Sequence, residues 1–116
     1  MADPNCLFCR IAAGEIPADQ VYADEHVVAF RDIAPQAPTH VLIIPRKHIA
    51  SVNDLAPDDT EVIGNLYQAA KALAEQEGIA EDGYRMVINA GADGGQTVFH
   101  LHLHLLGGRA MAWPPG

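Results

Sequence analysis

The feature that most constrains this chain is a strict alternation of histidine with leucine close to its C-terminus. Residues 99–105 read Phe-His-Leu-His-Leu-His-Leu. Successive side chains of a strand point to opposite faces of the sheet. The segment is therefore expected to form a strand with one histidine face, made by His100, His102 and His104, and one apolar face, made by Phe99 and the three leucines. The apolar face can pack on the long helix described below, whereas the imidazole face needs polar surroundings.

Hydrophobic periodicity and turn residues predict the other elements. The expected elements are a short helix over residues 6–13 capped by Asn5 and ended by Gly14, strands over 20–22, 26–31, 40–45, 84–89 and 97–106, and one long helix that begins at 56–59 and ends at Gly78. The long helix would bury a stripe made by Val62, Ile63, Leu66, Ala70 and Leu73. Such an arrangement is typical of an α+β domain with a mostly antiparallel sheet. The length of 116 residues predicts a single domain over residues 1–116.

The charge balance argues against several classes of partner. Seven Lys and Arg residues stand against 15 Asp and Glu, so the net charge is −8. A nucleic-acid backbone or an anionic membrane surface would be repelled on average, and we expect neither as a partner. No apolar run approaches the roughly 18 residues that a membrane span needs. Residues 1–4 do not resemble a secretory signal, so we expect a cytoplasmic protein.

Two chemical interpretations of the histidine face are open at this point. Three alternating histidines can ligate a metal ion, or one of them can act as a nucleophile on phosphorus while its neighbours bind the phosphate. The glycine-rich loop over residues 90–96 favours the second, because glycines let backbone N–H groups approach an anion closely. Asn89 and Thr97, at the two ends of this loop, add neutral donors. Such a site could hold a phosphate without lysine or arginine.

At these residues the sequence resembles the histidine-triad (HIT) family, and within it the HINT branch. The family pattern places three histidines in alternation with apolar residues and ends on two apolar residues, as residues 100–106 do. The other segments that resemble this branch are 30–33, 35–40, 44–48, 83–87, 91–96, 107–109 and 113–116. The resemblance implies a small HIT-like α+β domain that pairs as a two-fold homodimer and joins two sheets into one.

The resemblance also implies an activity. HINT-like proteins bind purine nucleotides and hydrolyse phosphoramidates of adenosine or guanosine monophosphate. By position, His102 would be the nucleophile that forms a nucleotidyl-histidine intermediate, His104 would contact a phosphate oxygen, and His100 and His40 would complete the catalytic group. The remaining nucleotide contacts implied by the resemblance are Phe30 and Ile33 at the base, Asp32 at the ribose, and Asn89, Gly95 and Thr97 at the phosphate. Trp113 would lie near the active site of the partner subunit.

Cys6 and Cys9 have the C-x-x-C spacing of half a zinc site. In some bacterial HIT proteins such a pair is completed by the histidines at the positions of His48 and His100. The resemblance therefore implies a structural zinc ion, and no organic cofactor is expected. The alternative is a pair of reduced thiols, or an occasional redox pair, with His48 on the surface.

Three other functions stay open from the sequence. A dinucleoside polyphosphate hydrolase or nucleotidyltransferase would use the same fold and the same histidines. A nucleotide-binding regulatory module would bind without needing to turn over its ligand. A metalloenzyme would use the three histidines as ligands of a catalytic metal ion.

Overall fold

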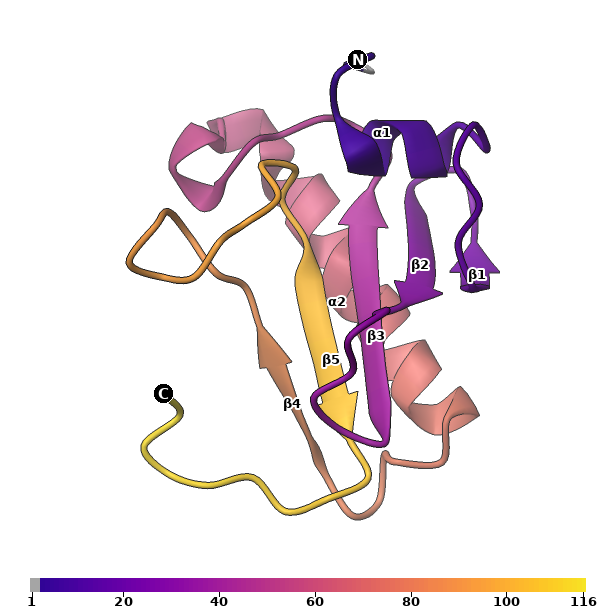
Figure 1. The fold of residues 1–116 in the computed structure, drawn as a ribbon, viewed down its shortest axis with the longest axis vertical. Helices are drawn as coiled ribbons and strands as arrows, with labels where there is room; N and C mark the ends of the chain where they lie inside the picture. The colour runs from indigo at the N-terminus through magenta and orange to yellow at the C-terminus, as the bar shows by residue number, and fades with distance from the viewer. Residues whose placement is uncertain (1–2) are drawn as a thin grey trace.

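The computed structural model describes residues 3–116. Its helices are α1 (Leu7–Ala12) and α2 (Thr60–Gln76), and its strands are β1 (Gln20–Ala23), β2 (Val27–Arg31), β3 (Thr39–Pro45), β4 (Tyr84–Val87) and β5 (Leu103–Gly107). The strands form one antiparallel sheet in the order β1-β2-β3-β5-β4. Helix α2 lies behind this sheet in Figure 1, and the short α1 lies beside the end of β3. The α+β fold with one long and one short helix is confirmed. Within the described residues, no helix is long and apolar enough to span a membrane.

The long helix forms where its apolar stripe predicts it. A short 3₁₀ turn over Pro57–Asp59 leads into α2, and the Asp59 carboxylate accepts hydrogen bonds from the Ala56 backbone and from Lys47. Gly78, with φ of +74°, follows the last turn and ends the helix as expected. Of the predicted stripe, Leu66, Ala70 and Leu73 are buried, and Val62 and Ile63 are partly buried against the same core.

The two faces of the sheet pack against different partners. Leu101, Leu103 and Leu105 belong to the main core beneath α2. On the opposite face, Phe30 of β2 and Leu42 of β3 pack with residues of α1. The main core also contains Val27, Ala29, Val41, Ile43, Ile49, Ala69, Ala74 and Ile79, and the smaller one contains Cys6, Phe8, Cys9, Val28 and Ile44. The predicted separation of leucines from histidines therefore holds, with the histidines on the face that carries α1.

The last strand is shorter than predicted. It begins at Leu103 instead of residue 97, and Phe99 is 54% exposed instead of packed on the long helix. Continuing the β3–β5 register would place Leu101 opposite Pro45, which has no backbone N–H to donate. The Pro45 carbonyl bonds to the His100 side chain, and the Leu101 N–H donates to the Ile49 carbonyl. These contacts keep the residues before Leu103 from pairing with β3.

Two smaller predictions are also corrected. Cys6, and not Asn5, caps α1, because the Cys6 sulfur accepts the Cys9 N–H at 3.3 Å while the Asn5 N–H donates to Asp3. The strand expected over residues 84–89 ends at Val87. Val87 pairs with His104, and continuing this register would place Asn89 opposite His102, which lies before the start of β5.

Candidate functional site

A cavity of about 420 Å³ lies on the sheet face that carries α1. Its apolar wall includes Phe8, Phe30 and Leu42, and its polar groups include His102 and His104. The other residues that line it are Leu7, Ile11, Ile16, Pro17, Ala18, Asp19, Arg31, Asp32, Ile33, Thr97 and Val98. The size and the few converging polar groups are those of a small-molecule site. The Arg31 guanidinium donates to both carboxylate oxygens of Glu77, at 2.8 and 3.0 Å, so it is already paired.

The ring of His102 is held in one tautomer by the main chain. Its Nδ1 lies 2.8 Å from the His100 carbonyl oxygen, which can only accept, so Nδ1 carries the proton. The neutral ring then has its lone pair on Nε2. The Phe8 ring packs edge-on against it, with centroids 5.1 Å apart and an interplanar angle of 88°. A neutral imidazole with a fixed tautomer at the wall of a cavity can act as a nucleophile.

A second fixed tautomer follows from a chain of hydrogen bonds behind this ring. The Gln36 backbone N–H donates to His40 Nδ1 at 3.0 Å, so a neutral His40 carries its proton on Nε2. His40 Nε2 then donates to His104 Nδ1 at 2.9 Å and faces an Asp32 oxygen at 3.4 Å. His104 is left with an Nε2–H. The chain therefore provides a hydrogen-bond donor on a ring whose centre lies 5.0 Å from the centre of the His102 ring.

Burial keeps the rings of His40 and His104 neutral. It lowers the pKa of His104 to about 4, and the neighbouring His102 and His40 lower it further while Asp32 opposes the shift. Burial also lowers the pKa of His40, again against Asp32. Near neutral pH the two rings are therefore uncharged, as the tautomer assignments require. The cavity lining also contains the charged side chains of Asp19, Arg31 and Asp32.

Gln96 is a residue of the site that sequence reasoning missed. It is buried, and its side-chain oxygen accepts the Gly91 N–H at 3.0 Å. Its amide nitrogen donates to the carbonyls of Ala50 and Val98, at 2.7 and 3.1 Å. One side chain thus closes the glycine-rich loop on itself and ties it to Ala50, which is distant in sequence. A glutamine beside glycines gives no sign of burial in a single sequence.

The structure brings most of the predicted nucleotide contacts together. Phe30, Asp32, Ile33 and Thr97 line the cavity with His102 and His104, and Ile33 is fully exposed at its mouth. Asn89 and Gly95 lie next to each other, because a Cβ added to Gly95 would be 4.0 Å from the Asn89 amide nitrogen. These two residues are not in the cavity wall itself. Phe8 and Leu42 are part of the wall that the sequence did not indicate.

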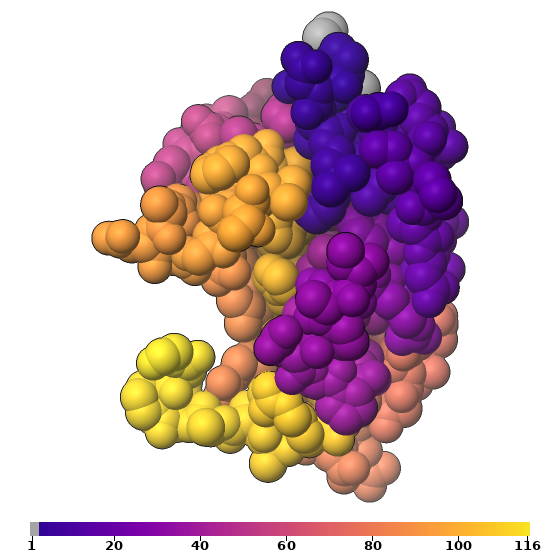
Figure 2. Space-filling model, viewed as in Figure 1, coloured from indigo at the N-terminus to yellow at the C-terminus, as the bar shows by residue number. Residues whose placement is uncertain are grey.

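Trp113 lies apart from the cavity of its own chain. It is 81% exposed, and the Arg85 guanidinium carbon lies 5.9 Å from its ring centre. Arg85 also donates to the Ala112 carbonyl at 3.0 Å, which holds the tail beside β4. Figure 2 shows the C-terminal tail and the glycine-rich loop standing out on the same side of the molecule, with a hollow between them.

A second cluster lies next to the cavity and has a different chemistry. The ligand atoms of Cys6, Cys9, His48 and His100 all lie within 4.8 Å of one another. His100 Nδ1 is 3.3 Å from the Cys6 sulfur, 3.4 Å from the Cys9 sulfur and 3.2 Å from His48 Nδ1, and His48 Nδ1 is 3.3 Å from the Cys9 sulfur. Burial lowers the pKa of His100 to about 4 and raises the pKa of the Cys9 thiol.

The donor set of this cluster fits a tetrahedral metal ion. His100 Nε2 donates to the Pro45 carbonyl at 2.8 Å, so the lone pair of a neutral ring is on Nδ1, toward the two sulfurs. Zinc bonds of about 2.3 Å to sulfur and 2.0–2.1 Å to nitrogen would give ligand separations of roughly 3.3–3.8 Å in a tetrahedron. The observed contacts of 3.2–3.4 Å lie at or slightly below the short end of that range.

The three-histidine metal site is not what the structure shows. His100 directs both ring nitrogens away from the cavity, toward the Pro45 carbonyl and the two sulfurs. His102 uses Nδ1 on the main chain. Two groups of residues among 3–116 could hold a metal ion, and neither contains all three histidines. They are Cys6, Cys9, His48 and His100, and Asp32, His40 and His104. The same geometry keeps the His100 ring out of the cavity. The contribution of His100 to the cavity is its backbone carbonyl, which holds the ring of His102.

Comparison with known proteins agrees with this geometry. The family model of the HIT domain matches residues 13–111, and the chain belongs to the HIT domain family. A purine nucleoside phosphoramidase of Escherichia coli is 53% identical over 105 residues, which are 90% of this chain and 88% of that protein.

Two solved structures are similar as well. The crystal structure of a HIT family hydrolase from Legionella pneumophila has 62% identity and a TM-score of 0.95, over 97% of this chain and all of that one. A zinc-bound histidine-triad family protein from Mycobacterium smegmatis has 34% identity and a TM-score of 0.77, over 90% of this chain and 76% of that one.

Proposed function

We propose that this protein hydrolyses the P–N bond of purine nucleoside 5′-phosphoramidates, in which AMP or GMP is linked to an amine. The observation that carries the proposal is the fixed tautomer of His102, whose Nδ1–H is held by the His100 carbonyl and whose ring lines the cavity. The similarity to a purine nucleoside phosphoramidase supports the choice of substrate class. The physiological amine and the preferred purine are left open by this proposal.

The reaction would proceed in two displacements. The lone pair of His102 Nε2 attacks the α-phosphorus, the leaving nitrogen takes a proton from solvent as the P–N bond breaks, and the neutral amine departs. The nucleotidyl group is then bonded to Nε2. Water attacks the phosphorus, the bond to Nε2 breaks, and the nucleoside monophosphate is released with His102 restored. Dividing one difficult displacement into two easier steps is the advantage of covalent catalysis.

The remaining residues would bind and orient the substrate. The Nε2–H of His104 would donate to a phosphate oxygen, and Asn89, Gly95 and Thr97 would supply neutral donors. His40 would act through His104, to which it is hydrogen-bonded. Donors that carry no positive charge suit a chain with a net charge of −8.

The apolar half of the cavity would hold the nucleoside. Phe30 and Ile33 would contact the base, and Asp32 would accept hydrogen bonds from the ribose hydroxyls. One Asp32 oxygen already accepts the Ala34 N–H at 2.8 Å, and the other faces His40. A carboxylate has about four acceptor sites, so both oxygens keep capacity for a ribose.

We further propose that the cluster of Cys6, Cys9, His48 and His100 holds a zinc ion. The support is the fit of its sulfur and nitrogen atoms to a tetrahedral site and the existence of a zinc-bound relative. A zinc ion held by four protein ligands is closed to substrate and contributes to folding. It would join α1 to the segment that follows β3 and to the segment that precedes β5, and it would take no part in the reaction itself.

A two-fold homodimer is the assembly we propose. The outer edge of β4 has no neighbouring strand among residues 3–116, and an unpaired edge is a ready template for pairing with a second chain. Tyr67 of α2 and Met86 of β4 add exposed apolar surface. Pairing at this edge would put Trp113, which is held beside β4, close to a second subunit and near its cavity. The cytoplasmic location and the absence of nucleic-acid or membrane partners stay predictions.

Replacing the nucleophile tests the proposed function. Turnover of adenosine 5′-phosphoramidate by His102→Ala should fall at least about a thousandfold, while AMP binding measured by calorimetry changes little. His26→Ala is the matched control, because His26 is an exposed histidine outside the cavity. Full activity of His102→Ala would refute the mechanism. Faster turnover of a diadenosine polyphosphate than of the phosphoramidate would favour the alternative hydrolase, and binding without turnover of either would favour a regulatory module.

A further inference from the structure

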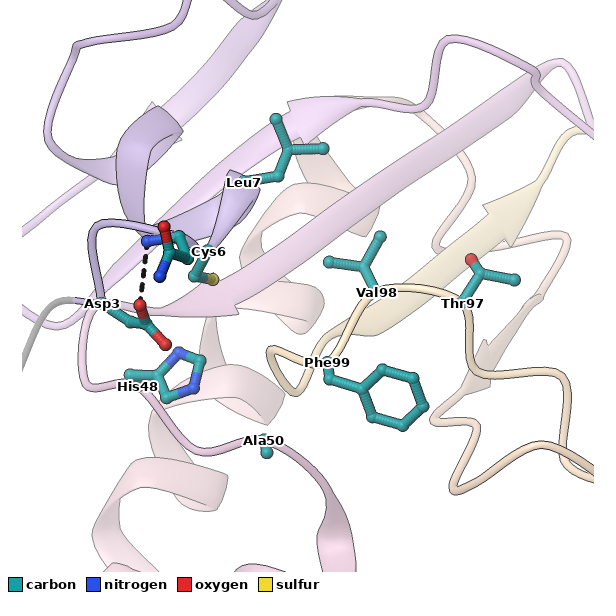
Figure 3. Close-up of a pocket in the computed structure, with 9 residues that line it drawn as sticks. Asp3, Cys6, Leu7, His48, Ala50, Thr97, Val98 and Phe99 are labelled. Carbon is teal, nitrogen blue, oxygen red and sulfur yellow. Dashed lines mark hydrogen bonds between the residues drawn. The ribbon is translucent and has the colours of Figure 1, made fainter.

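A second cavity reaches the cysteines from the outside, and it shares Leu7, Thr97 and Val98 with the wall of the first cavity. It has a volume of about 500 Å³ and lies between the N-terminal segment and the turn at residues 97–99. Asp3, Cys6, His48 and Phe99 are among the residues that line it, and Figure 3 shows the Cys6 side chain pointing into it. Thr97 is the one residue of this lining to which the proposed hydrolysis gives a role. The cavity gives a small solute access to one sulfur of the cluster.

The two cysteines differ in access. Cys6 lines the cavity, whereas Cys9 is 3% exposed and does not line it. Cys6 is also the cap of α1, and its sulfur accepts the Cys9 N–H at 3.3 Å. The thiolate is the nucleophilic form of cysteine, and Cys6 is the one of the two cysteines that a solute in the cavity can contact. A reagent that enters the cavity would therefore meet Cys6 first, with Cys9 directly behind it.

The spacing of the two residues also permits a disulfide. Their sulfur atoms lie within 4.8 Å of each other across the first turn of α1. A disulfide needs a separation of about 2.05 Å, which rotation of two small side chains toward each other can reach. The chain contains only these two cysteines, so any disulfide within one molecule joins Cys6 to Cys9.

We propose that Cys6 and Cys9 form a redox modification site that a small hydroperoxide oxidises reversibly to a disulfide. The Cys6 thiolate attacks the peroxide, the O–O bond breaks, and Cys6 becomes a sulfenic acid while the leaving oxygen takes a proton. The Cys9 thiol then attacks the Cys6 sulfur and displaces water. For hydrogen peroxide the sum is two thiols and one peroxide giving one disulfide and two waters. A metal ion held by the thiolates would be released, because the disulfide is not a comparable ligand.

The state of the pair would be felt at the nucleotide site through two neighbours. The first is His100, whose ring contacts both sulfurs and whose carbonyl holds His102 Nδ1 at 2.8 Å. The second is Phe8, which lies between the cysteines in sequence and packs on the rings of His102 and Phe30, with centroids 5.1 and 5.4 Å away. Closing the disulfide removes the sulfur contacts of His100 and shifts the turn that carries Phe8. This second half of the inference rests on the proposed function.

The experiment treats the full-length protein, of measured zinc content, with hydrogen peroxide and then with dithiothreitol. Intact mass should show the loss of two hydrogen atoms per chain, together with release of any bound zinc. Turnover of adenosine 5′-phosphoramidate should fall about fivefold or more and recover on reduction. Cys6→Ser and Cys9→Ser should form no disulfide within the chain. A sulfenic-acid trap should label Cys6 in Cys9→Ser, and label Cys9 in Cys6→Ser far more slowly.

The two halves can fail separately. Absence of the disulfide in the wild-type protein, or equal labelling of the two single variants, would overturn the redox site. A disulfide that leaves both AMP binding and turnover unchanged would overturn the coupling to His102. If the disulfide forms but the phosphoramidate is cleaved in neither state, the proposed function is refuted while the mass data still support the redox site.

Discussion

His100 and His102 are the same residue type, two positions apart on the same side of the sheet, yet the structure gives them opposite chemistry. His100 donates from Nε2 to the Pro45 carbonyl and has its lone pair on Nδ1, toward two sulfurs. His102 donates from Nδ1 to the His100 carbonyl and has its lone pair on Nε2. A backbone carbonyl thus decides which nitrogen of each ring is free. The His100 ring belongs to the cluster with Cys6, Cys9 and His48, and the His102 ring lines the cavity.

Removing the proposed zinc ion should distinguish the cluster of Cys6, Cys9, His48 and His100 from the cavity most strongly. Chelation, or Cys9→Ser, is expected to lower the free energy of unfolding by about 4 kcal/mol. The reason is that an ion which binds the folded state and not the unfolded state stabilises the folded state. Turnover by the folded fraction should fall by less than about tenfold, because His102 keeps its main-chain partner. Urea unfolding with measured zinc content tests this, with His26→Ala as control. If the activation free energy of turnover rose by as much as the free energy of unfolding fell, the cluster and the cavity would be one functional unit.

Lowering the pH should destabilise the folded protein through His104, which lines the cavity. The pKa of His104 is about 4 in the folded protein and near 6.5 when unfolded, so below pH 6.5 the unfolded chain binds a proton that the folded chain does not. This contribution to stability is complete above about pH 6.5 and is lost as the pH falls toward 4. His40 shifts in the same direction.

The size of the acid effect can be measured with one variant. From about pH 7 to about pH 5, His104 should cost roughly 2 kcal/mol of unfolding free energy. Urea unfolding at the two pH values should show a dependence smaller by that amount in His104→Asn and unchanged in His26→Asn. An unchanged dependence in His104→Asn would mean that the ring titrates normally in the folded state.

Interrupting the hydrogen-bond chain behind His104 should have the smallest effect. His40→Asn removes the donor that fixes the His104 tautomer, so kcat should fall about tenfold, or about 1.4 kcal/mol, with little change in KM. Gln36→Ala is a matched control, because the contact to His40 comes from the Gln36 backbone N–H. Its kcat should stay near the wild-type value. A larger loss in Gln36→Ala than in His40→Asn would contradict the chain.

The alternation of residues 99–105 was enough to predict that the histidines and the three leucines lie on opposite faces, although His104 is the one histidine of the three within β5. The sequence could not show that the ladder stops at Leu103. That result depends on Pro45, which is distant in sequence, and on side-chain competition for its carbonyl. Phe99 is exposed for the same reason.

The site was predictable where the residue type carries the chemistry, as for the histidines, the cysteines and Asp32. It was not predictable where ordinary residues take on a role through long-range contacts. Gln96 ties its loop to Ala50 with its amide, and Phe8 joins the cysteine turn to the cavity wall. Those contacts exist only once residues about 50 to 90 positions apart have been brought together by the sheet.

The most direct test of the account is the tautomer of each ring, read by long-range ¹H–¹⁵N correlation of the ¹⁵N-labelled protein near neutral pH. The signals of His102 are assigned by their loss in His102→Ala. The account predicts a proton on Nδ1 of His102 and on Nε2 of His100, His104 and His40. A His102 ring that carries its proton on Nε2, or that shares the tautomer of His100, would contradict the division of the histidines into a nucleophile and a metal ligand.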